Sequence, residues 1–458
     1  MQTIAFTPGN IPVTGSVDVL VAGAGTAGAF TGISAARMGA RTMIIEQYGA
    51  PGGSQTLALV TPIMHSHITG DPQCSALADE VRARLAVLGA AYDTGDVNKG
   101  PFDPLALKFV LEQMIGESGC EILYHTVLIG VIRDGSRITH AVVFNDDGIN
   151  AIEAKQFVDC TGDGDLSVMA GAKFESGNEK GFNQAVSLRF QMTNVDVAAF
   201  GRYIAGLGGD YDEGNPVFHA ATTLHNYRWP LTKVFDKAFE DGLMTGQDIK
   251  YFQCFSVPGK PRDLCFNCPE LGSSKETLNA RYLSGKQAEG RRAIARVTGF
   301  LKERVPGFEK AYLSEVAPML GIRETRRIIA EYMLTGRDVV QYARFDDYIA
   351  TSNYPVDIHD AGEEDGLKFE YRDPGERYYH IPFRSLVVAG LDNLFVAGRC
   401  LGADFIAQST IRVQHTCRAS GEAAGIGAAM AASRDARANQ IDGASVRSVM
   451  AERGAKFL

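Results

Sequence analysis

The sequence lacks the features that mark several common classes of protein. The formal net charge is −9, and no stretch dense in lysine and arginine is interleaved with aromatics, so the footprint of a nucleic-acid partner is absent. No apolar run approaches the length of a membrane span. Residues 1–15 have neither the basic start nor the apolar core of a secretory signal. We therefore expect a cytoplasmic protein, without nucleic-acid or membrane partners, that handles a small-molecule substrate.

Cysteine is sparse and irregularly spaced, with eight residues along the chain. This spacing lacks the density and regularity of a disulfide scaffold. The single CxxC, formed by Cys265 and Cys268, lacks the second pair that a structural zinc site or an iron–sulfur cluster requires. We expect free thiols and no metal.

The sequence does contain enough apolar material for a sizeable core. It has 458 residues, of which 45% are hydrophobic and 22% charged, and this length suits two packed domains. Many of its 50 glycines lie between apolar runs, where the backbone must turn tightly or approach a ligand.

The first motif follows an apolar strand near the N-terminus. Residues 17–21 (VDVLV) are typical of a buried parallel strand, and the chain then turns through Gly23, Gly25 and Gly28 into a predicted helix that ends near Gly39. In this GxGxxG pattern the first glycine permits a tight turn, the second lets backbone approach a pyrophosphate, and the third lets helix and strand pack closely. The helix N-terminus offers free N–H groups to the phosphates.

A second apolar strand, residues 41–45, ends in Glu46. A carboxylate at this place accepts hydrogen bonds from the hydroxyls of an adenosine ribose and selects against a 2′-phosphate. The whole run predicts a Rossmann-type dinucleotide site, and the alternative is an ordinary βαβ unit with a tight turn. Residues 48–56 (YGAPGGSQT) then form a second glycine loop, which an extended cofactor needs as a further backbone cradle.

Further segments point the same way: EILYHTVLIGVI (121–132), FVDCTGDGDLSVMAG (157–171), GIRETRRI (321–328), YPVDIH (354–359), YHIPFRSL (379–386) and NLFVAGRCLGADFIAQSTIRV (393–413). With these motifs the chain resembles, over nearly its whole length, the FAD-dependent oxidoreductases of the glutathione-reductase-like superfold. The resemblance implies an α/β fold with a Rossmann-type FAD-binding domain and FAD as cofactor. It implies FAD contacts at Gly23, Ala24, Gly25, Thr26, Ala27, Gly28, Glu46, Gln47, Gly53, Ser54, Thr56, Val127, Thr161, Gly162, Asp163, Gly398, Arg399, Asp404, Ile411, Arg412 and Val413.

The last of these segments also carries a physical argument. Residues 393–397 predict a strand that stops at Gly398, and a helix beginning near Thr410 would aim its N-terminus at the flavin. Backbone N–H groups at about Ile411 to Val413 would then stabilise the negative charge of the reduced ring. The alternative is a terminal packing helix. By analogy with the family, Asp404 would hold the ribityl chain.

Some features of related flavoproteins are missing. Residues 47–73 contain no cysteine, which disfavours dithiol chemistry on the flavin. The glycines at 206–209 follow no convincing strand, so we predict a loop there and no separate nicotinamide nucleotide domain. Trp229 is the only tryptophan, which does not match the tryptophan-rich signature of flavin-dependent halogenases.

The cofactor domain is predicted to be discontinuous. Residues 1–175 and 387–458 would form the FAD-binding domain, and residues 176–386 an inserted α+β substrate domain. Within the insert, residues 182–192 alternate as a half-buried strand does, and residues 277–304 predict a long helix with a basic, solvated face.

Oxidation of an alcohol or amine by a flavin needs a base near the reacting carbon, and histidine is the usual residue. His65 and His67 follow the second glycine loop, and His65 is our first choice. His225 belongs to a polar-aromatic loop that would close over the pocket. A structural or surface role is the alternative for each of them. His359, His380 and His415 are further candidates.

The arginines of GIRETRRI offer a site for a carboxylate, with Arg323 and Arg327 on one face of a strand and Arg326 on the other. The alternative is ion pairing with Glu324 and Glu331. Of these arginines we take Arg323 as a candidate catalytic residue.

The leading functional hypothesis is hydride transfer to flavin N5 from a C–H bond, of the CH–OH type, in a small polar metabolite. One alternative is a flavin-dependent reductase of an activated C=C bond, in which arginine binds carboxylates and supplies a proton. A non-catalytic FAD-binding or electron-relay protein and an aromatic hydroxylase are two more. The electron acceptor and the oligomeric state stay open.

Overall fold

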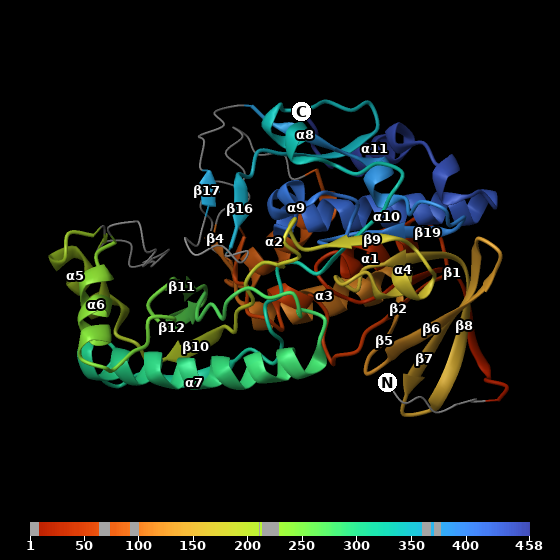
Figure 1. Ribbon diagram of the computed structural model, residues 1–458. Helices are drawn as coiled ribbons and strands as arrows, with labels where there is room; N and C mark the ends of the chain where they lie inside the picture. The colour runs from red at the N-terminus through yellow and green to blue at the C-terminus, as the bar shows by residue number, and fades with distance from the viewer. Residues whose placement is uncertain are drawn as a thin grey trace.

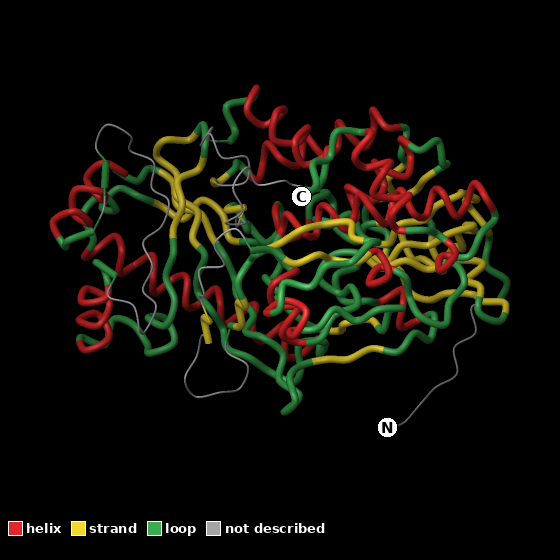
Figure 2. The backbone as a smooth tube through the Cα atoms, turned by 90° about the horizontal axis from the view of Figure 1, so that it is seen from above, coloured by secondary structure: helices red, strands yellow, loops and turns green. Residues whose placement is uncertain are grey.

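The computed structural model describes residues 9–63, 74–91, 100–209, 211–212, 229–359, 368–370 and 377–458. A seven-stranded sheet lies towards one end of an elongated molecule, and a smaller sheet lies towards the other (Figures 1 and 2). The larger sheet has the order β5-β2-β1-β8-β7-β6, and β19 also pairs with β8. Its strands are β1 (Val13–Ala22), β2 (Thr42–Ile45), β5 (Glu121–Leu123), β6 (Val127–Asp134), β7 (Arg137–Asn145), β8 (Gly148–Asp159) and β19 (Leu394–Val396).

The parallel part of this sheet positions the nucleotide motifs. Strands β5, β2, β1, β8 and β19 pair in parallel, whereas β6 and β7 are antiparallel additions. The first part of β8 pairs with β7 and its last residues pair with β19. The carboxyl ends of β1, β2, β8 and β19 therefore lie at one edge, which is where ligands bind in open parallel sheets.

Helices cover the larger sheet. Glycines of α10 (Gln414–Arg434) let this helix pack closely against α1 (Gly28–Arg37) and the residue before it. An added Cβ on Gly421 would lie 2.3 Å from the Ala27 carbonyl oxygen, and one on Gly425 would lie 2.1 Å from Ser34 Oγ. Thr31 Oγ1 also donates to the Gly421 carbonyl oxygen over 2.9 Å. The helices of this region are α1 (Gly28–Arg37), α2 (Ala76–Val87), α3 (Pro104–Ser118), α4 (Asp165–Met169), α8 (Gly336–Val340), α9 (Phe405–Ile411), α10 (Gln414–Arg434) and α11 (Gly443–Glu452).

A second hydrophobic core lies beneath the smaller sheet. That sheet has the order β11-β12-β10-β13, and α7 runs along it (Figure 1). Phe190 and Phe266 stack in this core with their ring centroids 4.5 Å apart. The elements are β10 (Phe190–Thr193), β11 (Cys254–Val257), β12 (Lys260–Phe266), β13 (Tyr312–Val316), α5 (Val197–Gly206), α6 (Thr232–Glu240) and α7 (Ala280–Arg304).

Two-stranded ribbons complete the described structure. They are β3 (Pro62–Ile63) with β4 (Gly100–Pro101), β9 (Phe174–Ser176) with β14 (Arg326–Ile328), β15 (Tyr348–Ser352) with β18 (Tyr379–Pro382), and β16 (Val356–Ile358) with β17 (Lys368–Glu370). Among the described helices none is both long and apolar enough to cross a membrane.

Several predicted elements are confirmed and others need correction. The strands at 17–21 and 41–45 and the long helix at 277–304 are present, and the glycines at 206–209 end α5 rather than follow a strand. The single strand expected over 121–132 is wrong, because His125 has a φ of +53° that separates β5 from β6. The strand expected over 182–192 is shorter, because regular pairing begins only at Phe190.

Candidate functional site

The turn after β1 is shaped by three glycines with different surroundings. An added Cβ on Gly23 would lie 2.7 Å from the Cys160 carbonyl oxygen, and one on Gly28 would lie 1.8 Å from the Gly23 carbonyl oxygen. Gly25 differs, since the nearest atom to its added Cβ is 3.9 Å away. Among the described residues no acceptor takes the N–H groups of Gly25, Thr26 and Ala27. This helix N-terminus therefore has an open side with free donors, which suits a phosphate.

Glu46 follows β2 beside this turn. Its side chain is buried, and it accepts the Ala24 N–H over 2.7 Å on one oxygen and the Tyr48 N–H over 2.9 Å on the other. Burial raises the pKa of Glu46, against the lowering effect of these hydrogen bonds. Each carboxylate oxygen keeps a lone pair for a further donor, such as a ribose hydroxyl.

The second glycine loop packs against the first turn. Gly52 and Gly53 have φ of +99° and +52°, and an added Cβ on Gly53 would lie 2.8 Å from Gly25 Cα. Thr26 Oγ1 and Ser54 Oγ are 3.1 Å apart. Thr56, in contrast, is buried and donates its hydroxyl to the Pro51 carbonyl oxygen over 2.6 Å. Gln47 is exposed.

A third segment joins the same edge of the sheet. Arg399 Nε donates to the Gly162 carbonyl oxygen over 2.7 Å, and Arg399 Nη2 donates to Asp163 Oδ1 over 2.6 Å. The Thr161 hydroxyl donates to Asp159 Oδ1 over 2.8 Å. The Gly398 N–H donates to Ser420 Oγ over 3.2 Å. Residues that sequence reasoning placed at the cofactor are thus brought together here, and Val127 is 40% exposed at the start of β6.

The helix expected from Thr410 onward is wrong in one respect. The chain forms two helices, because α9 ends at Ile411 and Val413, with ψ of 153°, caps α10. The Arg412 N–H already donates to the Gln408 carbonyl oxygen over 3.2 Å, so it is not free for a ligand. Within the described chain no acceptor takes the N–H groups of Val413 and Gln414. The free helix N-terminus therefore lies at α10.

Asp404 has a capping role in the same region. One of its oxygens accepts the Ala407 N–H over 2.7 Å, and the other accepts the Gly336 N–H over 2.7 Å. These bonds tie the first turns of α9 and α8 together.

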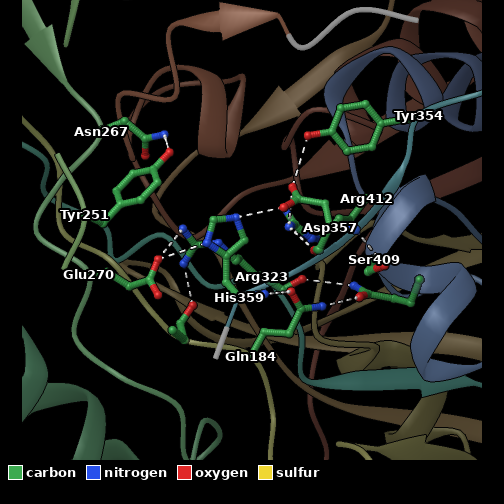
Figure 3. Close-up of polar contacts among 12 residues, drawn as sticks. Gln184, Tyr251, Asn267, Glu270, Arg323, Tyr354, Asp357, His359, Ser409 and Arg412 are labelled. Atoms are coloured by element: carbon green, nitrogen blue, oxygen red, sulfur yellow. Dashed lines mark hydrogen bonds and ion pairs between the residues drawn. The ribbon is translucent and has the colours of Figure 1, made fainter. Parts of the chain in front are cut away.

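A buried set of charged side chains lies where the smaller sheet meets α9 and α10 (Figure 3). His359 Nδ1 is 3.0 Å from Glu270 Oε2, and His359 Nε2 is 3.1 Å from Asp357 Oδ1. Arg323 Nη2 is 3.3 Å from Glu270 Oε2, and Arg412 Nη2 is 3.0 Å from Asp357 Oδ2. We call Glu270, Arg323, Asp357, His359 and Arg412 the polar cluster.

The surroundings of the polar cluster favour the ionised form of its two carboxyl groups. Burial opposes ionisation of Glu270, but Arg323 and His359 lower the pKa of this carboxyl to about 2. His359 and Arg412 likewise lower the pKa of the buried Asp357. These two carboxylates face the two ring nitrogens of His359. The positive charges of Arg323 and Arg412 balance the negative charges of Glu270 and Asp357.

A hydrogen-bond chain connects the polar cluster to the cofactor segment. Gln184 Nε2 donates to Gln408 Oε1 over 3.2 Å, and Gln408 Nε2 donates to the carbonyl oxygens of Arg323 over 2.9 Å and Arg399 over 3.3 Å. The Tyr354 hydroxyl also donates to Asp357 Oδ2 over 3.0 Å.

A model of the family described as FAD dependent oxidoreductase matches residues 18–450. The chain belongs to this family. Among solved structures it is similar to a geranylgeranyl bacteriochlorophyll reductase-like protein of Thermoplasma acidophilum, at 14% identity over 96% of this chain and 83% of that chain with a TM-score of 0.43. It is similar to p-nitrophenol 4-monooxygenase of Pseudomonas putida DLL-E4, at 11% identity over 96% and 87% of the two chains with a TM-score of 0.47. A myxobacterial chondrochloren halogenase matches at 11% identity over 96% and 79%, with a TM-score of 0.48. Comparison with curated proteins found no match.

FAD is the cofactor of this oxidoreductase. The described residues fit it in two ways that do not depend on the family. The open side of Gly25, with its unused N–H groups, accommodates the pyrophosphate, and the buried carboxylate of Glu46 retains acceptor capacity.

The structure describes only one of the four predicted catalytic residues. Arg323 belongs to the polar cluster, whereas His65, His67 and His225 lie outside the described residues. Arg326 and Arg327 are not in the cluster, because Arg326 pairs with Asp165 over 2.7 Å and Arg327 with Glu324. The ion-pairing alternative with Glu324 therefore holds for Arg327.

His380 also lies away from the polar cluster. It is bonded to Arg344 over 3.0 Å and to the Phe345 N–H over 3.1 Å, and burial together with Arg344 lowers its pKa to about 4. His359, in contrast, is at the centre of the cluster.

Sequence reasoning missed two carboxylates of the polar cluster. Asp357 and His359 are two residues apart at β16, and this spacing places both side chains on one face of a strand, so Asp357 could have been found. Glu270 had no local signal, because it reaches His359 only through the tertiary fold.

Proposed function

We propose that FAD binds along the edge formed by the carboxyl ends of β1, β2, β8 and β19. The pyrophosphate would lie on the turn from Gly23 to Gly28, the adenosine ribose on Glu46, and the flavin end near the start of α10. The remaining cofactor contacts are those proposed from the sequence, apart from the Arg412 N–H, which is already bonded to Gln408. Their support is that the first turn, the loop at Gly53 and the Arg399 segment adjoin one another.

We also propose a glutathione-reductase-like subtype with an inserted substrate domain. The two hydrophobic cores support an insert. The first core contains Ile328, Leu334 and Phe383. The second core contains Leu59, and its last buried residue in the sequence is Leu320. We therefore favour a boundary near residue 325 over the one at 386.

For the reaction, we propose that a small polar metabolite loses a hydride from a CH–OH carbon and a proton from the attached oxygen, leaving a carbonyl. Bound FAD supplies a ring that accepts the hydride at N5. The observation that carries this proposal is the polar cluster. It places buried charged groups where the smaller sheet meets α9 and α10. Such groups orient a polar substrate in a site shielded from water.

We propose His65 or His67 as the acceptor of the hydroxyl proton, with Arg323 and the rest of the polar cluster orienting the substrate. His359 is unsuitable in the described arrangement because both its ring nitrogens face carboxylate oxygens, at 3.0 Å and 3.1 Å. Gln414 Nε2 donates to the carbonyl oxygens of Val60 over 2.7 Å and Pro62 over 3.2 Å. This contact supports the proposal, since it brings the chain shortly before His65 to the start of α10. His225 remains a proposed pocket residue.

Anaerobic mixing of the holoenzyme with a panel of alcohols, hydroxy acids and amines tests the proposal. We expect at least one compound to bleach the flavin absorbance. Asp357→Asn should slow this reduction by about 100-fold, because it leaves Arg412 without its carboxylate partner and removes one of the two carboxylates beside His359. The protein should remain yellow. Asp236→Asn, at an exposed position of α6, is the matched control. Failure of every compound to bleach the flavin would remove the proposal.

The position of Arg323 favours one second candidate, a reductase of an activated C=C bond. This reaction adds a hydride and a proton to the double bond, and an arginine would bind the activating carboxylate. Photoreduced enzyme mixed with enoates and, separately, with O2 separates the two functions. Rapid reoxidation by an enoate would favour the reductase.

Two remaining functions have less support. A non-catalytic FAD-binding or electron-relay protein has no need for buried charges beside its cofactor, so the polar cluster argues against that function. An aromatic hydroxylase predicts NAD(P)H consumption that its substrate stimulates, and an unchanged rate would exclude it.

A further inference from the structure

Arg189 is a buried cation that pairs with no carboxylate among the described residues. It precedes β10, its side chain is 8% exposed, and its Nε and Nη1 atoms make no hydrogen bond within that part of the chain. Its neighbours Leu188 and Phe190 point into the second core. Because side chains alternate along an extended chain, Arg189 points to the opposite face of the smaller sheet.

This face of the sheet leads to the polar cluster. The charges of Arg323 and the hydroxyl of Tyr251 act on Arg189, and Tyr251 packs edge-on against His359 with ring centroids 5.8 Å apart. Burial lowers the pKa of Arg189 to about 9, which still leaves it charged at neutral pH. Glu270, a carboxylate of the cluster, is already bonded to Arg323 and His359.

A buried guanidinium without a counter-charge is strongly unfavourable, and a ligand that supplies the missing charge removes the penalty. The two arginines of the polar cluster already have carboxylate partners, whereas Arg189 adds a positive charge for which the described residues provide none. The pyrophosphate of FAD is not the missing anion, since its proposed site is at the turn through Gly25. A substrate with one negative charge would balance the charge of Arg189.

We propose that the substrate carries a carboxylate, and that Arg189 binds it together with Arg323. This inference rests on the proposed function, since it names the substrate class of that site. The planar guanidinium matches a carboxylate in geometry and forms charge-assisted hydrogen bonds with it. The Arg189–Arg323 pair therefore selects small organic acids over neutral alcohols.

Binding can be measured without turnover. Oxidised holoenzyme is titrated with lactate, malate and crotonate, with the corresponding amides, and with glycerol phosphate, while the visible flavin spectrum and the melting temperature are recorded. We expect at least one carboxylate to perturb the spectrum and raise the melting temperature, and its amide to bind about 100-fold more weakly. Arg189→Gln should lose a similar factor, and Arg189→Lys less. Arg262→Gln, exposed on β12, is the matched control.

Folding of the variant is checked in the same experiment. Arg189→Gln removes a buried charge that has no carboxylate partner in the described part of the chain, so without ligand it should stay yellow and melt at or above the wild-type temperature. If this variant does not fold, Arg189→Lys provides the comparison, because it keeps the charge and loses the planar fork.

Four results would overturn the inference: no carboxylate binds, glycerol phosphate binds instead, Arg189→Gln binds carboxylates as the wild type does, or Arg189→Gln changes only the flavin reduction potential. A carboxylate that binds through Arg189 but never exchanges hydride would refute the proposed function and leave this site standing. A neutral alcohol that bleaches wild type and Arg189→Gln equally would do the reverse.

Discussion

Alanine at Gly25 and at Gly28 tests whether the first glycine turn is built for its cofactor or for its own packing. At Gly25 the added methyl group meets nothing closer than the Cys160 carbonyl oxygen at 3.9 Å. We therefore expect the free energy of unfolding of the apoprotein to change by less than about 1 kcal/mol. At Gly28 the methyl group would lie 1.8 Å from the Gly23 carbonyl oxygen, so the backbone must shift at a cost of about 1–3 kcal/mol.

The effect on FAD should follow a different order. A methyl group at Gly25 fills the open side of the turn and holds the pyrophosphate away from the N–H groups of Thr26 and Ala27. A hydrogen bond to a charged group contributes about 1.5–3 kcal/mol. Loss of one such bond raises the Kd of FAD by about 10- to 100-fold. Gly25→Ala should therefore bind FAD poorly while folding normally, whereas Gly28→Ala should lose stability even without FAD.

Two measurements on apoprotein check this prediction: a thermal or urea denaturation curve, and a titration with FAD followed by its fluorescence. Gly116→Ala is the control, since this glycine is exposed on α3 with no atom near its added Cβ. Wild-type affinity for FAD in Gly25→Ala would refute the reasoning, because the open side of the turn would then have no role in binding. Equal stability of the two apo variants would refute the packing argument for Gly28.

Three further predictions concern substitutions of single residues. Glu46→Gln should destabilise even the apoprotein by about 1–3 kcal/mol in urea denaturation, because both carboxylate oxygens accept backbone N–H groups and an amide would face one of them with a donor. Glu422 is buried, and burial raises its pKa from the ordinary value of 4.5 to about 7. Its protonated form stabilises the folded state, so this stabilisation is fully present below pH 4.5 and is lost as the pH rises through 7. Glu422→Gln should therefore melt at the wild-type temperature near pH 4.5 and gain up to about 3 kcal/mol near pH 9, and a constant difference across this range would contradict the assignment. Gly421→Ala should lower the melting temperature clearly, since its methyl group would meet the Ala27 carbonyl oxygen at 2.3 Å, and an unchanged value would contradict the close contact of α1 and α10.

The nucleotide turn could be predicted from the sequence because its determinants are local. Gly23, Gly25 and Gly28 follow a strand of consecutive apolar residues, and Glu46 ends the next strand. Each role depends on neighbours close in the chain or on the adjacent parallel strand. Features of this kind can be predicted from the spacing of apolar residues, which repeats about every 3.6 residues in a helix and every two residues in a strand.

The break between α9 and α10 could not be predicted in this way. Residues 405–416 contain neither proline nor glycine, so local propensity favours one continuous helix. Tertiary contacts stabilise the break instead. Arg412 Nη2 donates to the carbonyl oxygen of Asp357 over 2.9 Å, and Gln414 Nε2 donates to the Val60 carbonyl oxygen over 2.7 Å. Glu270 was missed for the same reason, as its partners are distant in sequence.

These contacts also connect the chain around the smaller sheet with the start of α10. Arg323 and Glu270 come from the chain around the smaller sheet, and His359 connects them to Asp357. Asp357 in turn binds Arg412, which lies at the break that sets the start of α10. A ligand that changes the charge balance of the polar cluster therefore acts on the helix N-terminus proposed to face the flavin. Because Glu270, Arg323, Asp357 and His359 are buried, their interactions are weakly screened by salt, and a substrate carboxylate would tune the site through electrostatics as well as through position.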